Sequence, residues 1–147
     1  MLDRLSGDDV VSSRHFGCYA VIMRENSLLC VRKSRGPYKG LWDLPGGAPE
    51  LSESLEATLR RELWEETGST EVSHGPWHEF RLIVEKDSMG HPIQFIHEGV
   101  WRQSKVERID ENILPSEDTA GLAWIELKAL DRDSASALIC HVIASIQ

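Results

Sequence analysis

The stretch "SESLEATLRRELWEETG" (52–68) has the pattern of a helix, and three of its glutamates fall close together. Glu62, Glu65 and Glu66 are spaced i, i+3 and i+4, a spacing that gathers side chains on one side of a helix. Two carboxylates held about 4 Å apart repel by about 4 kcal/mol at an effective dielectric constant of 20. Selection for stability alone would separate such charges, so the cluster indicates a site for something positive.

An apolar stripe orients this predicted helix. The stripe consists of Leu55, Leu59 and Leu63. At about 100° per residue, Glu62 and Glu66 fall beside the stripe rather than opposite to it, and Glu65 lies further round the same side. We expect Ser52 to cap the N-terminus of the helix and Gly68 to end it. Because the acids flank a face that packs on the core, a merely solvated surface fits them poorly.

Nearby arginines account for only part of the negative charge. Arg61 can pair with Glu65, four residues further along. Arg60 can pair in the same way with Glu56, so neither arginine is expected to neutralise the other two glutamates. Clusters of carboxylate oxygens are preferred by Mg²⁺ and Mn²⁺. The turn "PGG" (45–47) lies just before the helix, and its carbonyls can approach an ion closely because glycine has no β-carbon. The pattern therefore predicts a site for a divalent cation.

The remaining chain predicts a mixed α/β fold. Strands are expected at 16–23, 27–34, 41–44, 78–86, 92–103 and 122–127, and a closing helix at 134–146. The first two strands are expected to form a hairpin. We find no internal repeat or long linker, so residues 1–147 are expected to form a single domain in which 1–13 are a loose lead-in. The irregular alternation of strands and helices favours an α/β sandwich over a doubly wound parallel sheet.

Composition excludes some classes of function. The chain is 41% hydrophobic and 27% charged, with a formal net charge of −8 and a pI near 5.2. A protein this acidic is not expected to bind a nucleic-acid polymer, which requires a basic face. The apolar runs are too short to cross a membrane, and the N-terminus lacks the apolar core of a signal peptide. Three scattered cysteines fit a reducing, cytoplasmic location.

The spacing around the glutamates resembles a known signature. From Gly47 the chain has five residues, then Glu53, then seven residues, and then "RELWEETG" (61–68). This resembles the Nudix hydrolase motif G-x5-E-x7-R-E-U-x-E-E-x-G-U, where U is a bulky aliphatic residue. The one departure is Ser69 at the final position, which we expect to affect helix packing more than chemistry. The resemblance implies the Nudix α/β/α sandwich, with a mixed β-sheet between helices.

The resemblance also implies an activity of the MutT-like kind. Members hydrolyse the pyrophosphate linkage of a nucleoside diphosphate joined to another moiety, and they require Mg²⁺ or Mn²⁺. On this sequence the metal ligands would be Glu62, Glu65, Glu66 and the carbonyl of Gly46. The resemblance implies that Glu53 and Arg61 mainly brace the loop and the helix, while Gly46 and Gly47 adjoin the substrate. Many relatives form dimers, so a homodimer is an open expectation.

Other polar residues are less specific candidates. Glu62 is one candidate general base, and Glu117 and Asp118 are others, although these two fit equally well as ordinary loop acids. Arg32 is a candidate phosphate ligand, as are its neighbours Lys33, Arg35 and Lys39, although surface bases on an acidic protein are an equal alternative. The aromatic candidates for stacking on a nucleobase are Tyr38, Trp42, Trp77, Phe80 and Trp101, each of which fits a core position better.

The substrate is the least determined feature. Some relatives that cleave ADP-ribose carry a proline about 15 residues after the motif, and some that cleave dinucleoside polyphosphates carry a tyrosine nearby. The segment "LIVEKDSM" (82–89) has neither, which favours a nucleoside triphosphate, with damaged or deoxy forms included. A nucleotide sugar or another linked nucleoside diphosphate is the alternative. A domain that senses a nucleotide metabolite without hydrolysis is the competing class, and the complete acid set weighs against it.

Overall fold

The computed structural model describes residues 11–113 and 119–147. Within these residues, the larger sheet consists of β5 (Gly46–Gly47), β1 (Val11–Val21), β8 (Pro92–Val106) and, on the far side of β8, both β6 (Glu71–His74) and β7 (His78–Lys86). The smaller sheet contains β2 (Met23–Arg24), β3 (Ser27–Lys33), β4 (Trp42–Asp43) and β9 (Thr119–Glu126). β1 runs parallel to β8, whereas the other pairings are antiparallel, so the larger sheet is mixed.

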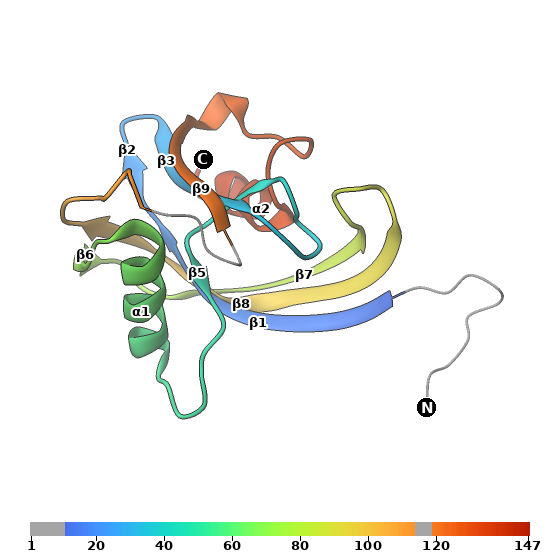
Figure 1. Ribbon diagram of the computed structural model, residues 1–147, viewed down its shortest axis with the longest axis horizontal. Helices are drawn as coiled ribbons and strands as arrows, with labels where there is room; N and C mark the ends of the chain where they lie inside the picture. The colour runs from blue at the N-terminus through green and yellow to red at the C-terminus, as the bar shows by residue number, and fades with distance from the viewer. Residues whose placement is uncertain (1–10, 114–118) are drawn as a thin grey trace.

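The helices α1 (Leu55–Thr67) and α2 (Ala137–Ile146) cover opposite faces of the curved sheet (Figure 1). Alternate residues of β1 show this directly, because successive side chains of a strand point to opposite faces. Cys18 and Ala20 pack in one core cluster with the leucines of α1, whereas Tyr19 and Val21 pack in another with α2. A short 3-10 turn (Leu127–Ala129) links β9 toward α2. The expected sandwich of helices around a mixed sheet is confirmed.

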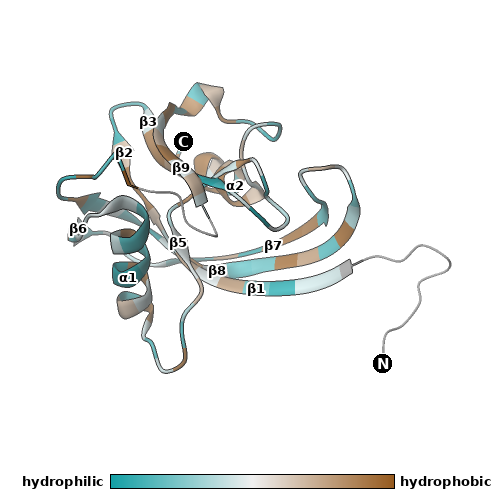
Figure 2. Ribbon diagram, viewed as in Figure 1, coloured by the Kyte–Doolittle hydropathy of each residue, from teal (hydrophilic) through white to brown (hydrophobic). Residues whose placement is uncertain are grey.

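The helices differ in character. In Figure 2, α1 is largely hydrophilic along its length, whereas α2 carries much more apolar surface. Leu59 and Leu63 of α1 pack in the core, whereas Glu56 and Glu65 are exposed. No helix in the described part of the chain is long and apolar enough to span a membrane.

The predicted strands are mostly confirmed, with changes in pairing. The expected hairpin between 16–23 and 27–34 is wrong in part, because only Met23–Arg24 pair with β3. The rest of the first run lies in β1, which pairs with β8 far along the chain. The "PGG" turn also contributes a short strand, β5, and β6 was not predicted. Residues 11–13, expected to be part of a loose lead-in, belong to β1, while 1–10 lie outside the described residues.

The expected N-terminal cap of α1 is wrong by two residues. Ser54 is the cap, and its side chain accepts a hydrogen bond from the N–H of Ala57 at 3.1 Å. Ser52 has a φ of 69° and lies in a tight turn in which the N–H of Glu53 donates to the carbonyl of Glu50. Gly68 ends the helix in the left-handed conformation, as predicted.

Ser69, the departure from the motif, is buried without a hydrogen-bond partner for its hydroxyl among the described residues. A buried unpaired hydroxyl is destabilising, so we expect Ser69→Ala to raise the free energy of unfolding by about 1 kcal/mol. Urea denaturation measures this change. The same substitution at the cap, Ser54→Ala, is the matched control and should lower the free energy by about 1 kcal/mol. Destabilisation by Ser69→Ala would show that the hydroxyl has a partner.

Candidate functional site

Glu66 lies at the centre of the acidic part of the candidate site. It is 8% exposed, and its carboxylate accepts a hydrogen bond of 2.7 Å from the N–H of Gly46. Burial, followed by the charge of Glu62, raises the pKa of Glu66 well above its usual value. The φ of Gly46 is 145°, and a Cβ there would lie 2.1 Å from the carbonyl oxygen of Cys18. The close approach of β5 to β1 therefore requires glycine at this position.

Glu62 lies beside the second glycine of the turn. A Cβ added at Gly47 would lie 2.3 Å from a carboxylate oxygen of Glu62, so the missing side chain makes room for that carboxylate. Arg61 Nη1 lies 2.6 Å from Glu62 and 3.6 Å from the more exposed Glu65. The expectation that Arg61 would leave Glu62 unpaired is therefore wrong.

Arg61 also ties the helix to the preceding loop. Its Nε and Nη2 donate to the two carboxylate oxygens of Glu53 at 2.8 and 2.9 Å, and Nη2 donates to the carbonyl of Ala48 at 3.1 Å. Thr58 adds a hydrogen bond to Glu53 at 3.0 Å. The hydrogen bonds from Arg61 lower the pKa of Glu53 to about 2. These contacts support the bracing role that the motif implies for both residues.

The chemistry of the acidic group suits a hard divalent cation. Glu62 and Glu66 interact closely enough to raise the pKa of the latter, and both lie against backbone that has no side chain in the way. Among the described residues, however, no three such groups already surround a common point. Arg61 holds Glu62 and Glu65 instead. Glu62 contacts Arg61 through one carboxylate oxygen, while its other oxygen faces Gly47.

A cavity of about 380 Å³ lies between β1, β8 and the loop that follows β3. Its lining includes the basic residues Arg14, Lys33 and Arg35 and the ring-bearing residues His15, Tyr19, Tyr38, Phe95 and His97. Asp43 contributes a carboxyl group, which is buried and accepts a hydrogen bond from Ser136 at 2.7 Å. On a protein of net charge −8, this concentration of cations and rings indicates a pocket for a planar, anionic ligand.

The cavity adjoins the acidic group where β1 meets β5. Lys33 lines the cavity, and its charge opposes the effect of burial on the pKa of both Asp43 and Glu66. Tyr19 lines the cavity and pairs with Gly46 across the sheet. The metal-binding candidates and the cavity are therefore adjoining parts of one site.

His97 forms the floor of the cavity and is held from both sides. Its Nε2 lies 2.8 Å from the hydroxyl of Tyr19, and its Nδ1 lies 2.8 Å from the hydroxyl of Tyr38. The hydroxyl of Tyr19 occupies the space above Gly17, where a Cβ would lie only 2.4 Å away. Burial, with smaller contributions from His15 and Lys33, lowers the pKa of His97 to about 3. The imidazole is therefore neutral at physiological pH.

The low pKa of His97 predicts a dependence of stability on pH. Between about pH 6.5 and pH 3, the unfolded chain binds a proton at this residue that the folded chain does not. Stability should therefore fall as the pH drops below 6.5, by up to about 1.4 kcal/mol per pH unit from this residue. Urea denaturation at pH 7 and pH 5 measures the loss, which should be smaller in His97→Phe. Equal losses in both proteins would contradict a neutral buried His97.

The other sequence candidates separate into two groups. Arg32 stacks on Trp42 with its guanidinium 4.1 Å from the ring centre and donates to the carbonyl of Gly40 at 2.7 Å. Trp42 packs against the core cluster of α2, so Arg32 lies on that side, whereas its neighbour Lys33 lines the cavity. Of the aromatic candidates Tyr38 lines the cavity, while Phe80 and Trp101 pack in the core. Glu117 and Asp118 lie outside the described residues.

His97, Tyr19 and Asp43 were not among the sequence candidates. The segment 95–101 reads Phe-x-His-x-Gly-x-Trp, which places the histidine on the inward face of a strand. That position was a usable signal for His97. Asp43 had none, because only the fold brings it next to Lys33 and Tyr38.

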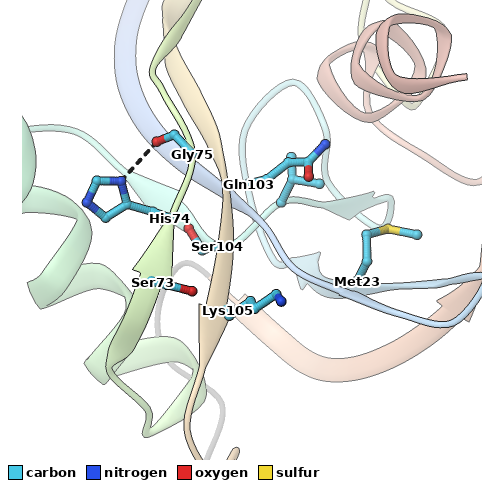
Figure 3. Close-up of a pocket in the computed structure, with 8 residues that line it drawn as sticks. Met23, Ser73, His74, Gly75, Gln103, Ser104 and Lys105 are labelled. Atoms are coloured by element: carbon cyan, nitrogen blue, oxygen red, sulfur yellow. Dashed lines mark hydrogen bonds between the residues drawn. The ribbon is translucent and has the colours of Figure 1, made fainter.

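A second hollow, of about 310 Å³, lies at the far end of β8 (Figure 3). Its polar lining comes from β6 and β8, and the dashed line marks the contact of 2.9 Å between His74 Nδ1 and the Gly75 carbonyl. Lys105 is the basic residue in the lining of this hollow, and no glutamate of α1 lines it. This hollow therefore lacks the combination of acids, cations and rings found at the site.

Comparisons with known proteins identify relatives of the chain. A family model described as the NUDIX domain matches residues 13–141. An ADP-ribose pyrophosphatase from Methanocaldococcus jannaschii is 40% identical over 48 residues, which are 33% of this chain and 28% of that protein. A MutT-like protein from Streptomyces ambofaciens is 47% identical over 49 residues, 33% of this chain and 30% of its own length. The chain thus covers less than a third of the length of these curated relatives.

The fold of this chain resembles that of a solved structure. The crystal structure of a MutT NUDIX hydrolase from Burkholderia pseudomallei aligns with a TM-score of 0.70. The alignment covers 92% of this chain and 99% of that chain, at 19% sequence identity. The two chains therefore share a fold over most of their length.

Proposed function

The chain belongs to the Nudix family, and we propose from this that it is a pyrophosphohydrolase dependent on a divalent metal. It cleaves the pyrophosphate linkage of a nucleoside diphosphate joined to another moiety. The observation that carries the proposal is that Tyr19 lines the basic, ring-lined cavity and pairs with Gly46, whose N–H donates to the buried Glu66 of the carboxylate cluster. A nucleotide has the matching parts, because its base is planar and its phosphates need both cations and a metal.

The residues of the acidic part hold the cation. Glu62, Glu65, Glu66 and the carbonyl of Gly46 provide oxygen ligands for Mg²⁺ or Mn²⁺. When bound, the cation would neutralise part of the pyrophosphate charge and lower the pKa of a water molecule. Glu62, or Glu117 or Asp118 from the later connection, removes the proton from the attacking water.

The residues of the cavity hold the substrate. Lys33 and Arg35 bind phosphate oxygens, and charge-assisted hydrogen bonds of this kind are among the stronger ones in proteins. Tyr38, Phe95 and the neutral His97 pack against the base without adding charge beside it. The contact between Glu53 and Arg61 holds the loop in place against α1.

We propose a nucleoside triphosphate as the substrate, with damaged or deoxy forms included. The absence of the proline and tyrosine signals in segment 82–89 supports this choice. ADP-ribose is the second candidate, because the M. jannaschii relative is named as an ADP-ribose pyrophosphatase. The products separate the two, since a triphosphate yields a nucleoside monophosphate and pyrophosphate, whereas ADP-ribose yields AMP and ribose 5-phosphate.

A substrate panel with a matched pair of variants tests the proposal. The panel contains ribo- and deoxynucleoside triphosphates, 8-oxo-dGTP, ADP-ribose and UDP-glucose, each with Mg²⁺, and the products are identified by chromatography. Lys33→Met should raise KM about ten-fold, since it removes one charge-assisted contact of about 1.5 kcal/mol. Arg32→Met, one residue away on the opposite face, should leave KM nearly unchanged. Binding of nucleotides without turnover across the panel would contradict a hydrolase.

A further inference from the structure

Arg102, on β8, is buried and holds two carboxylates that come from different elements. Its Nη1 and Nη2 donate to the two oxygens of Glu56, in the first turn of α1, at 2.6 and 2.8 Å. Its Nη2 and Nε donate to the two oxygens of Glu71, on β6, at 2.6 and 3.1 Å. The side chain of Arg102 is only 1% exposed, whereas that of Glu56 is 51% exposed, so the paired groups reach from the core to the surface beside the helix.

The neighbours of Arg102 fix its guanidinium in place. Its central carbon lies 4.1 Å from the centre of the Trp77 ring, within the range of a cation–π contact. Ser104 donates a further hydrogen bond of 2.5 Å to Glu71. Stability alone explains such a group poorly, because the cost of burying the charges commonly offsets their attraction. A rigid, fully bonded group of this kind instead fixes geometry.

The two flanks of α1 are thereby tied to different strands. At about 100° per residue, Glu56 lies on the side of the leucine stripe opposite to Glu62. Beyond the Leu63 edge of the stripe, Arg102 of β8 holds α1 through Glu56. Near the Leu55 edge, Gly46 of β5 holds it through Glu66. Together these contacts oppose rotation of the helix about its own axis in either direction.

We propose that Arg102 is a positioning residue that sets the rotation of α1, and with it the placing of the metal-binding carboxylates. The inference rests on the proposed metal site. Carboxylate groups project about 5–6 Å from the axis of a helix, so a rotation of about 20° moves them by about 2 Å. Metal–ligand distances tolerate only about 0.2 Å. A helix held on one flank alone would therefore bind the cation poorly even when fully folded.

Mn²⁺ binding tests the proposal without any substrate. Free Mn²⁺ is titrated into the metal-free protein and followed by electron paramagnetic resonance, and Tm is measured for each variant. Glu56→Gln removes the negative charge and one of the two acceptor oxygens on the helix but leaves Arg102 paired with Glu71, so the fold is retained. We expect this variant to bind Mn²⁺ about ten-fold more weakly. Arg102→Lys keeps the charge but loses the fork, and should weaken binding at least as much.

Matched controls carry the same kinds of substitution at residues that do not contact Arg102. Glu85→Gln alters an exposed glutamate of β7, and Arg60→Lys alters an exposed arginine of α1 itself. Both should keep the Mn²⁺ affinity of the unsubstituted protein. If Glu56→Gln and Arg102→Lys also keep that affinity, with or without a lower Tm, Arg102 is only a structural residue and the proposal fails. If the unsubstituted protein binds no Mn²⁺, the proposed metal site itself fails.

Discussion

Glu66→Gln is expected to remove nearly all hydrolysis while making the metal-free protein more stable. The amide cannot replace a charged ligand for a divalent cation, so kcat/KM should fall about 1,000-fold, equivalent to about 4 kcal/mol of transition-state stabilisation. The same change removes a buried charge that lies beside Glu62 and keeps an acceptor for the N–H of Gly46. Relief of that burial should add about 1 kcal/mol of stability, or about 3 °C in Tm.

Glu65→Gln is the matched control for these opposite effects. Glu65 is exposed and contacts Arg61 only at 3.6 Å, so its loss should weaken activity with little change in Tm. Activity is measured as product release with Mg²⁺, and Tm is measured in EDTA. Near-normal turnover by Glu66→Gln would contradict the assignment of Glu66 as a metal ligand. A lower Tm would contradict the inference that the buried Glu66 carboxylate destabilises the metal-free protein.

Gly47→Ala is expected to lower activity about 100-fold and to leave stability almost unchanged. The added methyl group would meet the carboxylate of Glu62 at 2.3 Å, so Glu62 must swing away from the place where it would meet the cation. A flexible side chain can move at little cost, which spares the fold. A loss of this size corresponds to about 2.7 kcal/mol.

Gly46→Ala provides the contrast. There the methyl group would meet the backbone of Cys18 at 2.1 Å, and the φ of 145° is unfavourable for alanine. Neither strain can be relieved by a side chain, so this variant should lose about 3 kcal/mol of stability or more. Thermal unfolding and product release are measured on both proteins. Full activity in Gly47→Ala would show that Glu62 does not need the space above that glycine.

The acidic part of the site could be predicted because its geometry is local. The spacing of Glu62, Glu65 and Glu66 follows from helical periodicity, and the link to Gly47 and Glu53 follows from distance along the chain. The two wrong predictions for this region, the partners of Arg61 and the N-terminal cap of α1, depended on the path of the loop before the helix. Arg61 reaches Glu62 and Glu53 together because the turn at 50–53 brings Glu53 back beside the helix, and that turn also places Ser52 too early to be the cap.

The cavity could be predicted only in part because it is assembled from distant segments. The alternation of a strand shows that Arg32 and Lys33 point to opposite faces, but it cannot show which face carries the site. The same limit applies to the first strand. Its long parallel pairing with β8, from Val11 opposite Ile93 onward, leaves no local signal, so a hairpin was predicted instead. His97 meets Tyr19 and Tyr38 only through that pairing and the loop above it.

The central claim is that the carboxylates of α1 bind a cation that hydrolysis requires. The most direct measurement follows turnover of the best substrate from the panel as Mg²⁺ is added to protein freed of metal with EDTA. We expect no turnover in EDTA, a saturable rise with Mg²⁺ in the unsubstituted protein, and near-background rates throughout for Glu66→Gln. Turnover that is equal with and without the cation, or with and without the carboxylate of Glu66, would contradict the claim.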